Sequence, residues 1–342
     1  MTNQPPIRFA AIGLNHNHIY GQTGLLLRAG AELVSFYSAE DDLAQEYQSR
    51  FDQATRVATQ EEILEDESID LVVSAAIPRL RPEIGIRAMQ HGKDYMSDKP
   101  AFTTLDQLAE VRKVQAATGQ IYSVNYSERL ETRVSTKIDE LLQAGAIGKV
   151  VQTLGLGPHR TRIETRPWWF FEEEQYGGII CDIASHQFDQ YLHYTGATDA
   201  EIVHAQVANY NHPQHPGLQD FGDVVVRSEG CTGYIRVDWF TPDGLATWGD
   251  GRLVIMGTDG YMEARKYVDI AGREGANHLF LVTQKETQYF DCSNEPLPYG
   301  EKLIADIRNR TETAMSQEHC FKASELALKA QAKATRVGYL VQ

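Results

Sequence analysis

Apolar segments alternate with helical segments through the first 125 of the 342 residues. The apolar run Ile7–Ile12 leads directly into Gly13, and Glu32–Tyr37 has the composition of a second strand. Leu71–Ala76 is expected to be a strand covered on both faces of a sheet. This β-α-β alternation predicts a doubly wound parallel sheet, a Rossmann domain, over residues 1–125. The other elements expected there are helices over 21–29, 41–51, 84–91 and 104–118 and strands over 94–97 and 121–125.

The rest of the chain has a different pattern, in which strands follow one another with few helices between them. Such a series predicts a mostly antiparallel open sheet, so we expect an α+β second domain over residues 126–342. Its expected strands are 150–156, 201–210, 223–227, 232–239, 252–256 and 288–292, and its expected helices are 135–144, 179–194, 299–309 and 323–336.

Composition excludes several classes of protein. Asp and Glu number 47 against 32 Lys and Arg, a net charge of −15 that argues against a nucleic-acid-binding protein. No run of 18 uncharged apolar residues predicts a membrane span, and the N-terminus has no secretory pattern. The four cysteines are widely spaced, as expected of reduced thiols in a cytoplasmic protein.

The segment after the first strand, Gly13-Leu14-Asn15-His16-Asn17-His18, resembles an imperfect GxGxxG dinucleotide fingerprint. Only the first glycine is present, but the strand before it and the helix after it favour a pyrophosphate bound at the helix N-terminus. His16 and His18 either reach the nicotinamide or substrate, or simply cap the helix. The predicted cofactor contacts are Gly13, Asn15, His16, Asn17, His18, Ser38, Ala76, Pro78, Lys99 and Asn125.

The residues after the second strand bear on the choice between NAD and NADP. Ser38 stands where an acidic residue usually holds the ribose hydroxyls, and a small neutral residue would admit a 2′-phosphate. Glu40 and Asp41 would repel that phosphate, and no Arg or Lys lies nearby to neutralise it. We therefore favour NAD, with NADP as the alternative.

Two segments carry candidate catalytic side chains. Lys99 follows a short strand, and the carboxyl ends of parallel strands face the cofactor crevice. Asp182 and His186 are four residues apart and share one face of a helix that opens at Gly177-Gly178. A lone lysine is often a surface cation and a histidine among apolar neighbours is often a core residue, so the pattern alone leaves both possibilities open. No metal-ligand pairing with a third nearby ligand is evident, and we predict no metal.

Three motifs in order resemble the Gfo/Idh/MocA oxidoreductases, named for glucose–fructose oxidoreductase and inositol dehydrogenase. Gly92–Pro100 is similar to the GK…EKP block of that family, Gly145–Val150 to its GxIGKV turn, and Gly177–His186 to its GGGxxxDxxxH helix. The resemblance implies a nicotinamide cofactor in the first domain and a sugar or polyol between the domains. It also implies a second domain whose open sheet mediates oligomerisation, so we expect a homodimer or homotetramer.

Carried over by position, the resemblance implies that Lys99, Asp182 and His186 are the catalytic residues. Departures from the family pattern are Asn15, His18, Ser38, Asp98 and Arg81, the last where a histidine is frequent. The implied reaction moves a hydride from a secondary alcohol to the nicotinamide. His186 acts as general base, Lys99 stabilises the developing alkoxide, and Asp182 binds a neighbouring hydroxyl. The predicted substrate contacts are Lys99, Tyr126, His159, Arg166, Trp168, Asp182 and His186.

Two other functions remain open from the sequence. An enzyme with tightly bound, recycled NAD would catalyse net elimination, epimerisation or glycoside cleavage with the same three residues. A non-catalytic regulator on the same fold would be expected to lack Lys99 or His186, and both are present.

Overall fold

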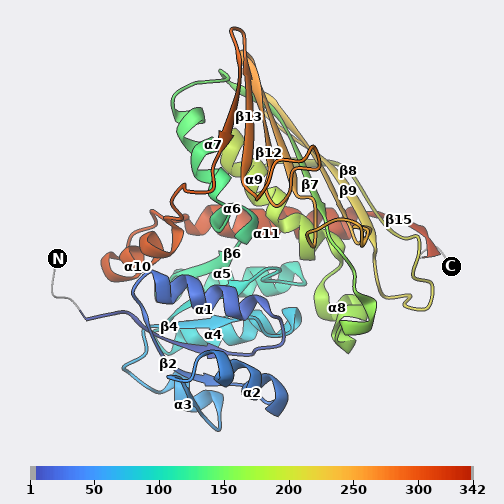
Figure 1. The fold of residues 1–342 in the computed structure, drawn as a ribbon. Coiled ribbons are helices and arrows are strands. Elements are labelled where there is room, and N and C mark those ends of the chain that lie inside the picture. Colours follow the sequence, from blue (N-terminus) through green and yellow to red (C-terminus); the bar gives the residue numbers. More distant parts are fainter. Residues whose placement is uncertain (1–4, 340–342) are drawn as a thin grey trace. The chain divides into compact units, whose positions relative to one another are not determined.

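The structure is a computed structural model and describes residues 5–339. Contacts divide the chain into two compact units, which we describe separately (Figure 1). The first unit contains residues up to Asn125 together with Pro298–Phe321, and the second contains Tyr126–Leu297 and the residues from Lys322 onward. This division falls at Asn125, and it places Pro298–Phe321, which the sequence assigned to the second domain, in the first unit.

A six-stranded, fully parallel sheet forms the centre of the first unit, with strand order β3-β2-β1-β4-β5-β6. The order reverses between β1 and β4, which confirms the predicted doubly wound Rossmann sheet. Its strands are β1 (Arg8–Ile12), β2 (Glu32–Tyr37), β3 (Thr55–Arg56), β4 (Leu71–Ser74), β5 (Asp94–Asp98) and β6 (Tyr122–Asn125). Its helices are α1 (His18–Arg28), α2 (Asp41–Arg50), α3 (Gln60–Leu64), α4 (Arg81–Gln90), α5 (Leu105–Thr118) and α10 (Tyr299–Asn309).

The late segment that contains α10 joins the first unit through close contacts. A Cβ added at Gly300 would lie 3.1 Å from the side chain of Leu25 in α1, so glycine lets the two helices approach closely. The hydroxyls of Tyr299 and Ser123 are hydrogen-bonded, which ties the start of α10 to β6. These contacts join residues about 175 or more positions apart, and no local pattern in the sequence indicates them.

The second unit is built on a nine-stranded mixed sheet with order β14-β13-β12-β11-β7-β10-β9-β8-β15. Among the strand pairs that the structure describes in this sheet, only β7–β10 and β8–β15 are parallel, so the predicted mostly antiparallel sheet is confirmed. Its strands are β7 (Val150–Pro158), β8 (Glu201–Asn209), β9 (Phe221–Ser228), β10 (Cys231–Asp238), β11 (Arg252–Gly257), β12 (Gly260–Arg265), β13 (His278–Thr283), β14 (Thr287–Asp291) and β15 (Thr335–Gly338).

Helices cover one face of this sheet. Residues of α7 and α9 pack on inward-facing residues of β11, β12 and β13 in one apolar cluster, which includes Ile138, Tyr194, Ile255, Met262 and Leu279. The helices of the unit are α6 (Ser127–Leu130), α7 (Arg133–Gln143), α8 (Glu173–Tyr176), a π-helical turn (Ile180–Ala184), α9 (Ser185–Thr195) and α11 (Gln317–Lys333), which begins in the first unit.

Four strands differ from the sequence expectation. The strands β3, β12 and β13 were not expected. β3 is only two residues long and gives no periodic signal, whereas the apolar run at 279–282 of β13 is itself typical of a strand and was missed. Residues 335 and 336, expected as the end of a helix, belong instead to β15, because residues 335–338 pair with residues 206–209 of β8. Residues 211–217 form the mostly exposed turn that their sequence favours, within which His212 is buried and its Nδ1 lies 2.9 Å from Asp220 Oδ2.

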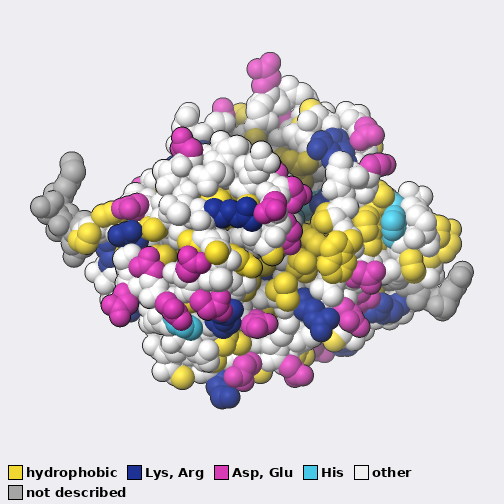
Figure 2. All heavy atoms as spheres, turned by 90° about the horizontal axis from the view of Figure 1, so that it is seen from below, with side chains coloured by type: hydrophobic (Ala, Val, Ile, Leu, Met, Phe, Trp, Pro, Cys, Tyr) yellow, Lys and Arg dark blue, Asp and Glu magenta, His cyan; other side chains and the backbone are white. Residues whose placement is uncertain are grey.

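The charged surface, the helices and the cysteines each bear on the expected class of protein. Acidic and basic side chains are interspersed over the face shown in Figure 2. Within residues 5–339, no helix has the length and apolar character needed to span a membrane. All four cysteines, Cys181, Cys231, Cys292 and Cys320, are buried and free, as expected of reduced thiols.

Candidate functional site

Gly13 forms the tight turn between β1 and α1. Its φ is +80°, and a Cβ at this position would lie 2.5 Å from the Cβ of Ala76. The turn is held by backbone hydrogen bonds: the Gly13 N–H donates to the Tyr37 carbonyl at 3.1 Å, and the Ala75 N–H donates to the Gly13 carbonyl at 3.1 Å. Only glycine allows this approach of the first turn to the end of β4.

Asn15 stands where the fingerprint has its second glycine, and the structure shows where its side chain goes. Its Nδ2 donates a hydrogen bond of 2.9 Å to Glu40 Oε1, so the amide is directed toward the loop after β2. Asn15 does not adopt a positive φ. The third glycine position is His18, the first residue of α1, with Asn17 as its N-cap.

A network of four side chains lies beside this turn, and sequence reasoning did not find it. His18 Nδ1 lies 2.9 Å from Asp98 Oδ1, and His16 Nδ1 lies 3.6 Å from Asp98 Oδ2. The guanidinium of fully buried Arg81 lies 3.1 Å from the same Oδ2 and donates to the carbonyl oxygens of Ala76 and Pro100 at 2.7 and 3.0 Å. The only sequence signals were the two histidines of the turn and the departures Asp98 and Arg81 from the family pattern.

The charges of this network shift the protonation of its members. Burial acts to raise the pKa of Asp98, but the interactions of its carboxylate with His18 and Arg81 hold that pKa well below its usual range. Burial lowers the pKa of His16 well below its usual value, and His18, Lys99 and Arg81 add to that effect. His16 Nδ1 also accepts the backbone N–H of His18 at 3.2 Å, as expected of a neutral ring.

Among residues 5–339, His16, His18 and Asp98 are the one group of three side chains close enough to share a metal ion, with ligand atoms within 4.8 Å of one another. The positively charged guanidinium of Arg81 already contacts Oδ2 of Asp98, so the carboxylate of this group has a cationic partner without a metal ion. We therefore assign the group as an ion-pair network, and the absence of a metal stays a prediction.

Lys99 lies directly after β5, between Asp98 and Pro100, and is 4% exposed. Its positive charge contributes to the lowered pKa of His16, so it acts electrostatically on the β1–α1 turn. A buried ammonium at the carboxyl end of a parallel strand is where the doubly wound fold places ligand-binding groups. This position favours the functional interpretation of Lys99 over that of a surface cation.

The remaining predicted cofactor residues also lie at strand ends. Ala76 follows β4, Pro78 begins a short 3-10 helix, and Asn125 ends β6; all three are buried. Ser38 is buried after β2, and its Oγ donates to Glu40 Oε2 at 3.0 Å.

The expectation that no Arg or Lys lies near Ser38 is wrong. Arg56 of β3 donates to the Ser38 carbonyl at 3.2 Å, because the short parallel strand β3 pairs with β2.

Asp182 and His186 lie in the second unit, on a helix that is not uniformly α-helical. Residues Ile180–Ala184 form a π-helical turn, which is frequent at functional sites, and α9 continues from Ser185. His186 is 2% exposed, and its ring centroid lies 6.4 Å from that of Tyr126 in an edge-on arrangement. Lys99 belongs to the first unit, so the convergence of all three side chains stays a prediction.

A buried charged pair lies close to the candidate histidine. Lys266 Nζ donates to Glu128 Oε2 at 2.7 Å and to Gln190 Oε1 at 3.1 Å, and Gln187 Nε2 donates to the same Glu128 oxygen at 2.9 Å. Burial acts to raise the pKa of Glu128, but its interactions with Lys266, His186 and His159 lower it to about 2. This carboxylate therefore carries a negative charge that interacts with His186.

The four other predicted substrate residues of this unit differ in their environment. The Tyr126 side chain is buried, with its hydroxyl 2.8 Å from Ser324 Oγ. His159 contacts the rings of Trp239 and Trp248, and the Arg166 guanidinium lies 4.7 Å from the Trp239 ring centroid. Trp168, by contrast, is 64% exposed. The structure therefore groups His159 and Arg166 around Trp239, and the substrate contacts stay predictions.

Comparison with known proteins places this arrangement in a family. Residues 7–126 match the model of an oxidoreductase family with an NAD-binding Rossmann fold, and residues 135–263 match the GFO/IDH/MocA C-terminal domain. The chain therefore belongs to the Gfo/Idh/MocA oxidoreductase family.

Solved and curated relatives agree with this assignment. A candidate oxidoreductase from Erwinia carotovora atroseptica SCRI1043 has a crystal structure that is 46% identical, with a TM-score of 0.95 over 97% of this chain and 100% of that one. Two Bacillus subtilis (strain 168) proteins are more distant. The scyllo-inositol 2-dehydrogenase (NAD(+)) is 25% identical over 58% of this chain and 56% of its own length. The scyllo-inositol 2-dehydrogenase (NADP(+)) is 26% identical over 49% of this chain and 46% of its own length. The chain thus spans about half the length of these curated relatives.

Proposed function

We propose that this protein is an NAD(P)-dependent oxidoreductase that transfers hydride between a nicotinamide and a secondary alcohol of a sugar, polyol or related cyclic substrate. The observation that carries the proposal is Lys99, a buried ammonium at the end of β5 whose charge acts on the β1–α1 turn. The curated relatives named as inositol dehydrogenases support a cyclic polyol or sugar as the substrate class.

The residues of the first unit fit a dinucleotide. Gly13 provides the tight turn after the first strand that a dinucleotide-binding fold requires, since Ala76 leaves no room for a side chain at this position. The N-terminus of α1 directs its partial positive charge toward the same turn. When it is bound, the nicotinamide supplies the hydride acceptor or donor.

The side chains of this chain supply proton transfer and charge stabilisation. His186 takes the proton of the substrate hydroxyl, and the nearby negative charge of Glu128 stabilises the imidazolium that forms. Lys99 donates a hydrogen bond to the same substrate oxygen and stabilises the developing alkoxide. Asp182 accepts a hydrogen bond from a neighbouring hydroxyl and so orients the ring.

The proposal includes a homo-oligomer in the cytoplasm. The face of the nine-stranded sheet opposite to α7 and α9 carries Met256, Tyr261 and Tyr289, each more than 40% exposed. Met256 and Tyr261 are cross-strand neighbours, so they form one apolar surface suited to a second copy of the chain. The four buried, free cysteines favour a reducing compartment.

A panel of polyols and sugars with NAD and with NADP, read as absorbance at 340 nm, tests the function. We expect coenzyme-dependent turnover of at least one cyclic polyol or sugar. Turnover without added coenzyme, with NAD retained through purification, would instead indicate the recycling enzyme. Coenzyme binding without turnover of any substrate in the panel would favour the non-catalytic regulator.

A further inference from the structure

An exposed but firmly held tryptophan lies in the second unit, in the loop of residues 239–251 that connects β10 to β11. The Trp248 side chain is 43% exposed. Its ring centroid lies 4.5 Å from that of His159 and 4.5 Å from that of Tyr267, distances typical of packed aromatic pairs. Two rings therefore fix the indole while much of its surface stays open to solvent.

Backbone contacts hold the same loop against the segment that follows β7. The Arg160 N–H donates a hydrogen bond of 2.8 Å to the Trp248 carbonyl. The Arg160 guanidinium donates to the carbonyl oxygens of Pro242 and Leu245 at 2.8 and 2.7 Å. The position of Trp248 is therefore set before a ligand arrives, so little conformational entropy is lost when one packs against it.

This loop lies at the end of the sheet that carries the candidate substrate residues. β7 and β10 are parallel neighbours, so the segments that follow them, including His159, lie at the same end. β11 is antiparallel to both β7 and β12, which brings Tyr267, just after β12, to that end as well. His159 and Tyr267 both interact electrostatically with Glu128, and Glu128 interacts in turn with His186. Trp248 is thus continuous with the surroundings of the proposed general base.

Exposure rises along this group of side chains. His186 is 2% exposed, His159 is half-buried and Trp248 is 43% exposed. Trp248 therefore lies on the solvent side of His159, further out than the group that takes the substrate proton. An indole at this place is suited to the part of a substrate that projects out of the site, since the C–H face of a sugar ring and a planar aromatic ring both pack on it.

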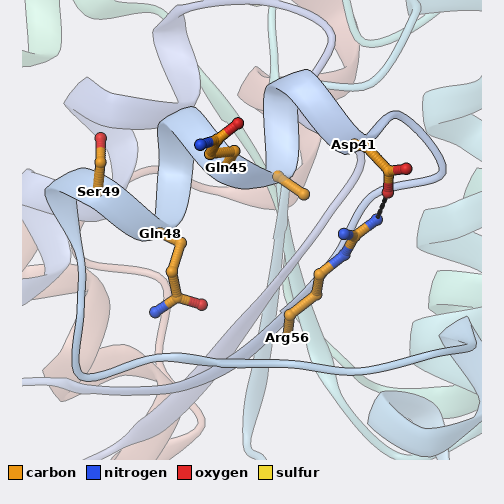
Figure 3. Close-up of a pocket in the computed structure, with 6 residues that line it drawn as sticks. Asp41, Gln45, Gln48, Ser49 and Arg56 are labelled. Atoms are coloured by element: carbon orange, nitrogen blue, oxygen red, sulfur yellow. Dashed lines mark hydrogen bonds and ion pairs between the residues drawn. The ribbon is translucent and has the colours of Figure 1, made fainter.

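The pocket along α2 of the first unit offers no comparable surface. It has a volume of about 380 Å³, and its lining residues are Asp41, Ala44, Gln45, Gln48, Ser49 and Arg56 (Figure 3). None of these side chains is aromatic, and the Arg56 guanidinium is paired with Asp41 at 2.7 Å. Stacking of a substrate ring is therefore better served by the loop that carries Trp248.

We propose that Trp248 forms a subsite for a second ring of the substrate, outside the sugar ring that reacts beside His186. The substrate class is then a disaccharide or a glycoside whose aglycone is a ring. This inference rests on the proposed function for the place of the reacting ring. A free monosaccharide or an open-chain polyol has no second ring to pack on the indole, so the subsite discriminates against both.

The test compares methyl with phenyl β-D-glycopyranosides of glucose, galactose and xylose, and adds cellobiose and lactose. Binding to the full chain with coenzyme present is measured by calorimetry, and kcat/KM by absorbance at 340 nm. We expect a phenyl glycoside or disaccharide to bind about 3- to 10-fold more tightly than the matching methyl glycoside. Trp248→Leu should abolish this preference, and Trp248→Phe should retain part of it because a ring remains.

Tyr210→Leu is the matched control, because it also replaces an exposed aromatic side chain of the second unit with leucine. Tyr210 is 48% exposed, its ring contacts that of Phe221, and it follows β8, which is two strands from β10 in the sheet. This variant should keep the preference for the second ring.

The inference is overturned if no compound with a second ring binds more tightly than its methyl glycoside, or if Trp248→Leu leaves the preference as Tyr210→Leu does. Coenzyme-dependent turnover in the same assays would then leave the proposed function standing. A preference that depends on Trp248, in a protein without coenzyme-dependent turnover, would instead support the subsite and overturn the proposed function.

Discussion

Gly13 is the residue at which backbone conformation and close packing both demand glycine. Gly13→Ala combines a strained φ of +80° with a 2.5 Å approach to Ala76. We expect a loss of about 1–3 kcal/mol in the free energy of unfolding and a marked loss of coenzyme affinity, measured by urea unfolding and fluorescence titration. Gly21→Ala is the control, because Gly21 is exposed in α1 and a Cβ added there would meet nothing beyond its own helix backbone within 4 Å. It should stabilise the protein slightly, by about 0.5–1 kcal/mol. Equal effects of the two substitutions would contradict the account.

His16 makes stability depend on pH in a known direction. Its pKa is lowered in the folded protein, so below about pH 6.5 the unfolded chain binds a proton that the folded chain does not. The contribution of His16 to the free energy of unfolding is therefore complete above about pH 6.5 and is lost as the pH falls below that value. His16→Gln should make the free energy of unfolding less pH-dependent between pH 7.5 and 5.5, by up to about 1.4 kcal/mol per pH unit. Urea unfolding at several pH values measures this, and parallel curves for the two proteins would refute the assignment.

Sequence reasoning could find the residues that follow strands, but not their partners. Gly13 and Lys99 were predicted from their places after β1 and β5. The contacts of Glu40 with Asn15 and of Asp98 with His18 and Arg81 depend on which strands are neighbours in the sheet. Arg56 was missed for the same reason, because β3 is two residues long and gives no periodic signal.

At the scale of elements, the buried Glu128–Lys266 pair links α6 to the residue after β12, and Gln187 and Gln190 join it from α9. Lys266→Met leaves an uncompensated buried carboxylate and should cost about 3–5 kcal/mol in the free energy of unfolding. Glu128→Gln together with Lys266→Met should recover a large part of that loss in urea unfolding.

The control for this pair lies on the surface of α7. Lys137 forms an i,i+3 pair with Glu140 at 2.8 Å, and Lys137→Met should change stability by no more than about 1 kcal/mol. If Glu128→Gln with Lys266→Met is no more stable than Lys266→Met alone, the buried, unpaired charge of Glu128 is not the cause of the loss in the free energy of unfolding.

Local sequence signals located elements well where they were strong. Thr104 forms a capping box with Gln107 and Gly119 ends α5 in the left-handed region, so this helix was predicted within one residue at its start. The π-helical turn before His186 has no such signal, because its wider hydrogen bonding depends on packing. The first two residues of β15 were predicted as the end of a helix, because only the pairing with β8 makes residues 335–338 a strand.

At the scale of the whole molecule, the exposed sheet face predicts self-association. Met256→Lys with Tyr261→Lys places charge on two cross-strand neighbours of that face. We expect light scattering to give the mass of a dimer or tetramer for the wild-type protein and a smaller mass for the double variant. Gln45→Lys on α2 is the control and should leave the mass unchanged. A wild-type protein that is monomeric at tens of micromolar would contradict this assembly.

The most direct test of the central claim is a double-mutant cycle on kcat/KM. Lys99 and His186 are proposed to act on one substrate oxygen, so Lys99→Met and His186→Asn should each lower kcat/KM by about 10²–10⁴. Because residues that act as a unit give non-additive effects, the double variant should lose little more than the worse single variant. If the two losses instead multiply, the two side chains act independently and the shared-oxygen mechanism is wrong.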